Sequence, residues 1–259
     1  MSTLLLYNNY VESSTIVASS EDASYPASNI QVTATTKEWR TESAITSANV
    51  VFDLGSAQSV DYLFLVGNAL DSGLNFTSIT LQANSSDSWG APAYDSGAIT
   101  SFPENLLYLT TGGETYRYWR LVIEDTSGAS FTGFSNLFLG SAITLPNNNI
   151  DRSWSLRQEA RADIQSGLYG QRFITKYNKQ KSFNNLIFNL LTKDELDILE
   201  LLFADRGVSK PVWFMLDSAQ ELINTREKLA GYFWIDTRPV INHTSFGLYS
   251  ISFSLTQVI

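Results

Sequence analysis

The stretch Tyr249–Thr256, YSISFSLT, alternates apolar and small polar residues along its whole length. Successive side chains of a β-strand point to opposite faces of a sheet, so this pattern predicts a strand with one face in the core. The serines and the threonine would lie on a solvated or polar face. The face predicted to be buried consists of Tyr249, Ile251, Phe253 and Leu255.

The first half of the chain contains many shorter stretches of the same kind, separated by loops rich in serine, asparagine and glycine. In one of them Trp119, Leu121 and Ile123 share a side. No amphipathic helix of useful length is evident in this half. Several short strands with turn signals between them predict a β-sandwich. The predicted strands are 50–55, 60–66, 76–83, 116–123 and 138–140.

The second half differs because it contains a convincing helix, Thr192–Arg206. Thr192 and Glu195 have the spacing of a capping box, and Gly207 follows as a candidate C-cap. Strands are expected over 211–216, 231–235 and along the final stretch, which together predict a β-barrel-like α+β domain with one main helix. The apolar stripe of the helix is formed by Leu196, Leu199, Leu202 and Phe203.

Between the two halves lies a polar stretch that contains a proline and three asparagines, Leu145–Asn149. Such a stretch has little to pack and is typical of a linker. We therefore expect a sandwich domain at 1–143, a linker at 144–150 and a second domain at 151–259. The overall fold class is predicted to be mainly β.

The charge of the chain changes at the same place. Residues 1–143 carry 4 Lys and Arg against 14 Asp and Glu, a net charge of −10, whereas residues 144–259 carry 13 against 12, a net charge of +1. Two units in different surroundings would explain this step, and so would two unrelated compositions. The net charge of −9 argues against nucleic acid as the main partner. No stretch reaches the roughly 20 apolar residues of a membrane helix, so we expect no membrane insertion.

The residues needed for catalysis are scarce. The chain has no cysteine and one histidine, His243, which we expect in a loop between strands. No nucleophile motif, phosphate loop or metalloprotease motif occurs, so we predict no enzymatic activity, no metal and no cofactor. A carboxylate pair for glycoside hydrolysis is the weaker alternative. Calcium is another alternative, although solvated acidic loops explain the same residues: Asp53, Asp61, Asp71, Asp87, Asp95 and Asp125.

Two aromatic residues in the loop 88–94 are the candidate ligand-binding or interface residues, Trp89 and Tyr94. An exposed ring among polar neighbours can stack on a sugar or anchor a protein interface. The favoured alternative is that both rings cover a sheet edge. The arginine of Trp39-Arg40 could bind an anion or stack on an aromatic ring, and we favour a structural role in which it holds its loop against the sheet.

Four segments of the first half stand out in order along the chain: Tyr25–Ile30, Trp39–Thr41, Val51–Gly55 and Tyr118–Ile123. They resemble discoidin-like domains, also described as coagulation factor 5/8 C-type or galactose-binding-like domains, and in particular the version found in phage tail proteins. Their order fits that family, and the resemblance covers roughly residues 10–140. It implies a β-sandwich, but it transfers no ligand because fold alone does not determine function.

Six segments of the second half follow one another in order: Gly167–Arg172, Phe183–Leu190, the helix ending at Gly207, Lys210–Phe214, Gly231-Tyr232 and Tyr249–Leu255. They resemble the small barrel domains of bacteriophage tail-tip and baseplate proteins, including distal-tail-like ones. Each matching segment is weakly specific alone, and their order behind a discoidin-like domain strengthens the resemblance.

The resemblance implies a structural component of a phage tail tip or baseplate, assembled in the host cytoplasm and located in the virion tail. Its expected partners are other tail proteins and further copies of the chain in a three- or six-fold ring, with the acidic sandwich projecting outward. The alternative is a non-catalytic carbohydrate-binding adhesion module that recognises a host-surface glycan.

Overall fold

The protein is mainly β, with one α-helix among the residues described by the computed structural model. The described residues fall into two compact units. Unit 1 contains those of Met1–Leu5, Ile143–Ala219 and Leu229–Ile259, and the described part of unit 2 lies within Leu6–Ala142. The described residues are 3–34, 36–67, 76–100, 106–126, 128, 131–145, 151, 153–166, 172–216 and 230–258.

The chain passes between the units inside two strands. β1 (Thr3–Asn9) and β9 (Asn136–Leu145) each begin in one unit and end in the other. Unit 1 therefore combines the start of the chain with its second half. Thr144 and Leu145 belong to β9, where the sequence predicted the start of a linker, and residues 146–150 lie outside the described residues.

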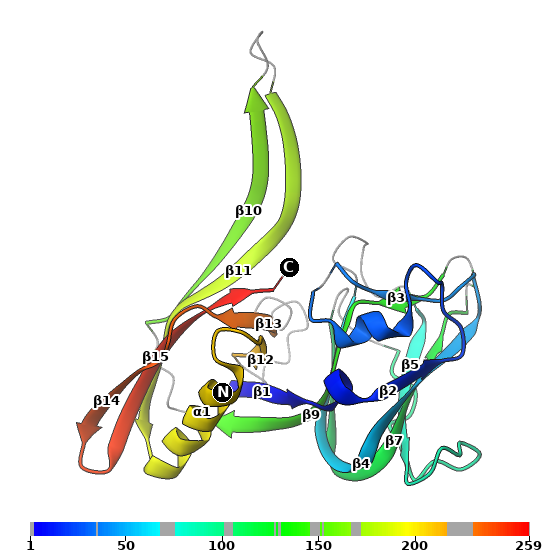
Figure 1. Cartoon of the computed structure of the whole chain (residues 1–259), viewed down its shortest axis with the longest axis horizontal. Helices are drawn as coiled ribbons and strands as arrows, with labels where there is room; N and C mark the ends of the chain where they lie inside the picture. The colour runs from blue at the N-terminus through cyan, green and yellow to red at the C-terminus, as the bar shows by residue number, and fades with distance from the viewer. Residues whose placement is uncertain are drawn as a thin grey trace. The chain divides into compact units, whose positions relative to one another are not determined.

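Unit 2 contains an antiparallel sheet with the strand order β9-β4-β7-β5-β6, and β2 pairs with the first part of β4 (Figure 1). A small second sheet pairs β3 with β8. Two short 3-10 helices, η1 and η2, complete the unit. The bounds are η1 Tyr10–Ser13, β2 Thr15–Ala18, η2 Ala27–Gln31, β3 Trp39–Arg40, β4 Ser47–Val66, β5 Ser78–Asn84, β6 Tyr94–Asp95, β7 Leu106–Glu124 and β8 Gly133–Phe134.

The core of unit 2 lies between the two sheets. Trp119 of β7 is fully buried in it, and the ring of Trp39 from the small sheet meets Phe134 edge-on with 5.4 Å between centroids. Buried Asn9 fixes the first strand by accepting the Leu139 N–H and donating to the Leu137 carbonyl, both of β9. The predicted β-sandwich is confirmed, and over β2, the first part of β4, β5 and β6 the other side of the main sheet lies outside this core.

The strands β4, β7 and β9 of unit 2 are longer than the sequence predicted, whereas β5 is one residue shorter than the predicted strand 76–83. The predicted strands 50–55 and 60–66 form one element, β4, with a register break between Asp53 and Gln58. Gly55 adopts a left-handed φ of +78° at this break, a conformation that glycine reaches without strain. The sequence predicted that a strand ends at Gly55, whereas in the structure Gly55 lies in a bulge within β4.

Unit 1 contains the strand order β10-β11-β15-β13-β12-β1, and β14 pairs with the outer part of β15. β10 and β11 form a long curved hairpin arm (Figure 1). The predicted mainly β class with one main helix is confirmed. The bounds are β10 Ser155–Ser166, β11 Arg172–Leu191, α1 Lys193–Arg206, β12 Val212–Met215, β13 Ala230–Ile235, β14 Val240–Ser245 and β15 Leu248–Gln257.

The helix α1 begins and ends as its sequence predicts. The Thr192 hydroxyl accepts the Glu195 N–H, and the Glu195 carboxylate accepts the Thr192 N–H, which completes the capping box. Gly207 follows with a φ of +52°. The helix packs on β15, where the rings of Phe203 and Phe253 meet edge-on at 5.3 Å. The residues of the predicted stripe that are fully buried are Leu196, Leu199 and Leu202.

Two further predictions have outcomes in unit 1. His243 was expected in a loop, but it lies in β14 opposite Tyr249, and their ring centroids are 5.0 Å apart. The loop assignment was wrong because the polar run of this segment is typical of an exposed strand with little burial on either face. The segment Gly167–Gln171, used for the tail-protein resemblance, lies outside the described residues.

Candidate functional site

The outer face of the unit 2 sheet carries a row of side chains that crosses five strands. Residues directly opposite one another on antiparallel strands share a face, and the strand register places five residues side by side. Their neighbours along each strand, such as Phe52, Trp119 and Leu81, point into the core. The row therefore faces away from the core, and it runs Val17, Val51, Arg120, Gln82 and Asp95.

Three members of this row form a chain of hydrogen bonds. Arg120 donates from Nε and Nη2 to the amide oxygen of Gln82, with 3.0 Å from Nε. The Gln82 amide nitrogen donates to Oδ2 of Asp95 at 2.7 Å. The other oxygen of Asp95 accepts the N–H of Gly97 at 2.7 Å. Each polar group is therefore oriented by its neighbour before any ligand arrives.

Trp89 lies over this row. The guanidinium carbon of Arg120 is 4.5 Å from the centroid of the Trp89 ring, within the range of a cation–π contact. The indole N–H donates to Oδ1 of Asp87 at 2.7 Å. The loop itself is fixed by the side chain of Asn84, which donates to the Ser88 carbonyl at 2.7 Å. The ring is only partly buried, so a rigidly held aromatic surface meets solvent beside charged groups.

Tyr94, the second candidate aromatic, lies on the opposite face of the sheet. It pairs with buried Ala83, and its ring centroid is 5.9 Å from that of Trp119 in the core. Burial, together with the negative charges of Glu114 and Asp95, raises the pKa of the Tyr94 phenol, so the hydroxyl stays neutral. The structure therefore does not bring Trp89 and Tyr94 together, and Tyr94 covers an edge of the core.

The electrostatics of the face depend on Arg120. Burial lowers the pKa of its guanidinium, while Asp87 and Asp95 act in the opposite direction. An arginine remains charged in either case because its ordinary pKa is so high. A cation between two carboxylates and an amide offers both hydrogen-bond donors and acceptors in fixed directions, next to an aromatic ring. This combination suits a polar, uncharged ligand with many hydroxyl groups and an apolar face.

The acidic residues proposed as calcium ligands are dispersed in the structure. Among the described residues, no three His, Cys, Asp or Glu side chains gather as a metal site would require, and Asp71 lies outside them. Asp53 is bound by Arg117, whose Nε and Nη2 donate to the two carboxylate oxygens at 2.7 and 2.8 Å. This pairing lowers the pKa of Asp53 to about 2.

Arg40 has the structural role that its sequence predicted. Its guanidinium lies 4.3 Å from the ring centroid of Tyr25 and 4.3 Å from that of Phe131. It also pairs with the largely buried carboxylate of Glu38. The Arg40 side chain thus ties two loops of unit 2 to the small sheet.

The sequence did not identify Arg120 and Gln82 as part of a site. The signal was present in the alternation of Tyr116–Ile123, where an arginine stands between two residues of the buried side. Which side chain faces it, however, depends on the register of β5 against β7. That register joins residues about forty positions apart, which periodicity alone does not determine.

Comparison with known proteins gives one partial match to a family model. A family model described as the XRCC1 N terminal domain matches residues 9–89, less than half of the chain. The sequence has no significant match among curated proteins. None of the described helices is long and apolar enough to cross a membrane.

Three solved structures align with about half of the chain. Chitosan-binding module 1 of a chitosanase/glucanase from Paenibacillus sp. IK-5 is 20% identical, with 52% of this chain and 100% of that chain covered and a TM-score of 0.44. A Clostridium perfringens module in complex with GalNAc-β-1,3-galactose is 14% identical, with 52% of this chain and 100% of that chain covered and a TM-score of 0.43. A fucose-binding module of Streptococcus pneumoniae is 11% identical, with 52% of this chain and 98% of that chain covered and a TM-score of 0.45. None of these is a phage tail protein, and the tail-protein resemblance stays a prediction.

Proposed function

We propose that unit 2 is a non-catalytic carbohydrate-binding module and that the glycan binds on the sheet face around Trp89. The observation that carries the proposal is the indole ring held over Arg120, beside the hydrogen-bonded chain to Gln82 and Asp95. A sugar ring presents an apolar C–H face and a rim of hydroxyl groups. The indole would stack on the first, and the three polar side chains would hydrogen-bond the second.

The rigidity of this face supports binding. Ordering a long side chain on binding costs free energy, and a side chain that is already held costs less. Trp89 is fixed by Asp87, and Arg120 by Gln82, so both lose little freedom when a ligand arrives. A guanidinium carries five N–H groups, so Arg120 keeps donors for glycan oxygens beside the two that bind Gln82.

The absence of catalysis is part of the proposal. The single His243 lies in unit 1, and the chain has no cysteine nucleophile. The carboxylates of the face, Asp87 and Asp95, already accept hydrogen bonds from Trp89 and Gln82. Both carboxylates therefore serve to orient the side chains of this face.

The test is a glycan array probed with the whole chain and with two variants. Wild-type protein should bind a defined set of glycans, and Trp89→Ala should lose at least roughly tenfold in affinity, because an aromatic anchor carries much of the binding energy. The matched control is Trp154→Ala, which removes another partly buried tryptophan, from unit 1, and should bind as wild type does.

Two results of the array would reject the proposal. One is that the folded wild-type chain binds no glycan. The other is that Trp89→Ala binds the same glycans with unchanged affinity, which would place any sugar site elsewhere. Product formation from a bound oligosaccharide, measured on the same samples, would reject the non-catalytic part alone.

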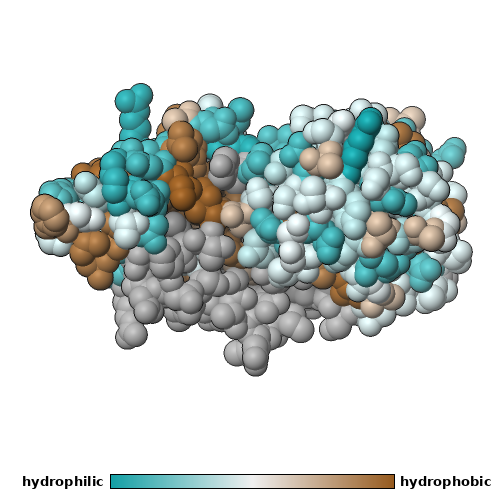
Figure 2. Space-filling model, turned by 90° about the horizontal axis from the view of Figure 1, so that it is seen from below, coloured by the Kyte–Doolittle hydropathy of each residue, from teal (hydrophilic) through white to brown (hydrophobic). Residues whose placement is uncertain are grey.

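A second candidate function, a structural component of a larger assembly such as a phage tail tip or baseplate, is favoured by the surface of unit 1. Large apolar side chains are exposed there, and apolar surface gathers over unit 1 on the face drawn in Figure 2, while white and teal predominate over unit 2. Exposed apolar patches of this kind mark protein interfaces. The exposed residues are Leu190, Ile198, Leu201, Val208, Val240, Ile241 and Phe246.

This second candidate is tested by isolating particles. If the chain is a virion component, an antibody against it should label one end of purified phage tails in electron micrographs. Absence of the protein from purified particles would reject the tail assignment, and it would leave the carbohydrate proposal unaffected.

A further inference from the structure

Phe246 is held outward at the tip of the hairpin formed by β14 and β15. Its side chain is 101% exposed. The turn consists of Phe246 and Gly247, and the left-handed φ of +73° at Gly247 makes it tight. The residues on either side, Ser245 and Leu248, pair across the hairpin, and the Thr244 hydroxyl donates to the Leu248 carbonyl at 3.1 Å. A rigid turn therefore presents a phenyl ring to solvent.

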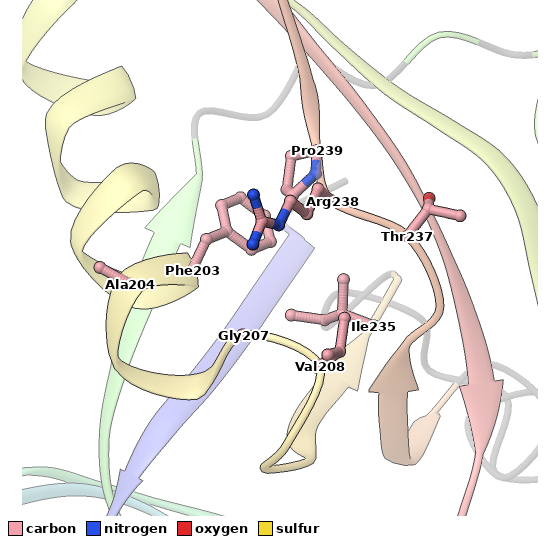
Figure 3. A pocket seen from close by; sticks show the side chains of 8 residues that line it. All are labelled: Phe203, Ala204, Gly207, Val208, Ile235, Thr237, Arg238 and Pro239. Atoms are coloured by element: carbon pink, nitrogen blue, oxygen red, sulfur yellow. The ribbon is translucent and has the colours of Figure 1, made fainter.

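A pocket of about 510 Å³ opens elsewhere in the same unit, between the end of α1 and the segment that follows β13 (Figure 3). Its volume lies in the range of about 300–1,000 Å³ that is typical of small-ligand sites. Apolar side chains line most of it, with one cation and one hydroxyl. The main lining residues are Phe203, Val208, Ile235, Thr237, Arg238 and Pro239.

Arg238 gives the pocket a preference for an aromatic guest. Within the described part of the chain its guanidinium makes no hydrogen bond, ion pair or ring contact, and it is exposed. Other arginines of this protein, such as Arg40, Arg117 and Arg120, stack on aromatic rings at 4.3–4.9 Å from the centroid. A guanidinium attracts the negative face of a ring, so Arg238 and a phenyl group complement each other.

The ring cannot enter the pocket of its own molecule. The pocket includes Pro239, and Phe246 follows the six-residue strand β14, which spans about 20 Å when extended. The pairing of β14 with β15 keeps this strand straight. The guest must therefore come from another chain.

We propose that Phe246 of one copy inserts into the Phe203–Pro239 pocket of a second copy and stacks against Arg238. Such a contact is head-to-tail, because each copy uses two different patches, and repeated contacts build a closed ring or a filament. The net charge of +1 over residues 144–259 allows these units to approach without strong repulsion. The inference concerns unit 1 and does not depend on glycan binding by unit 2.

Because the chain has no cysteine, single-cysteine variants give a direct test. Ser245→Cys, which keeps the neighbouring Phe246 ring, and Val208→Cys, mixed under mild oxidation, should form a disulfide-linked dimer, because insertion of the ring brings the two positions close together. Ser245→Cys alone should not form it. The control replaces Val208→Cys by Leu190→Cys, a residue of unit 1 that is 58% exposed and lies outside the pocket. No dimer in the mixture, or equal yields with the control, overturns the proposal.

A second experiment measures self-association by analytical ultracentrifugation of variants that carry no cysteine. Wild-type chain should self-associate as its concentration rises, and Phe246→Ser should weaken that association by roughly tenfold or more, as the loss of a buried aromatic anchor does. Leu201→Ser, which removes another exposed apolar side chain outside the pocket, should associate as wild type does. Circular dichroism verifies that the variants fold. A wild-type chain that stays monomeric, or a Phe246→Ser chain that associates normally, overturns the proposal.

Discussion

The outer sheet face of unit 2 and the surface of unit 1 around α1 and β14 differ in the side chains that they expose to solvent. On the first, the aromatic and charged side chains beside Gln82 have polar partners: Trp89 donates to Asp87, and Arg120 donates to Gln82. On the second, Leu201, Val208 and Phe246 stand in solvent with more than half of their surface exposed. A face with fixed polar groups suits a hydroxylated ligand, whereas bare apolar side chains suit another protein surface.

The largest effect should come from the core side of the unit 2 sheet. Trp119 is fully buried, so Trp119→Ala should lower the free energy of unfolding by about 3–5 kcal/mol. Trp89→Ala removes a ring from the other side and should cost only about 1–2 kcal/mol, for one hydrogen bond and one cation–π contact. Denaturant unfolding of both variants checks this contrast, and equal losses would mean that Trp89 is a core residue.

A neighbouring pair on α1 gives the same contrast in unit 1. Leu202 is fully buried and Leu201 is 69% exposed. Leu202→Ala should cost about 2–5 kcal/mol because it leaves a cavity, whereas Leu201→Ala should change stability by no more than about 0.5 kcal/mol. Thermal and denaturant unfolding of the two variants measures the difference. A large loss for Leu201→Ala at low protein concentration would show that its side chain is already covered within one chain.

The smallest effect concerns pH. The pKa of Asp53 falls from 3.8 to about 2 in the folded chain, chiefly through its hydrogen bond with Arg117. Because the folded pKa is the lower one, the pair stabilises the fold fully above about pH 4, and this contribution is lost as pH falls toward about 2. Denaturation midpoints over this window should drop less in Asp53→Asn than in wild type. Identical pH profiles would contradict the pairing.

Local signals predicted several elements well. The helix was found because Thr192, Glu195 and Gly207 mark both its ends and its buried leucines repeat at helical spacing. β15 was found because Ile251, Phe253 and Leu255 alternate with small polar residues, and all three are buried. Each of these signals lies within a few residues of the chain, where backbone geometry decides the outcome.

Other features depend on contacts between distant parts of the chain. Trp89 and Tyr94 are five residues apart, and the sequence analysis assigned both to one candidate loop. In the structure, however, Tyr94 belongs to β6 and its side chain faces the core. β1 joins a unit whose other residues follow Ile143, and no local pattern indicates that pairing. The chain of hydrogen bonds from Arg120 to Asp95 likewise requires three strands in one register.

Glycan binding at the Trp89 face is tested most directly by the structure of the whole chain in complex with the strongest glycan found on the array. We expect a sugar ring stacked on Trp89, with its hydroxyl groups within hydrogen-bonding distance of Arg120, Gln82 or Asp95. A sugar bound elsewhere on the chain, with the Trp89 face empty, would contradict it.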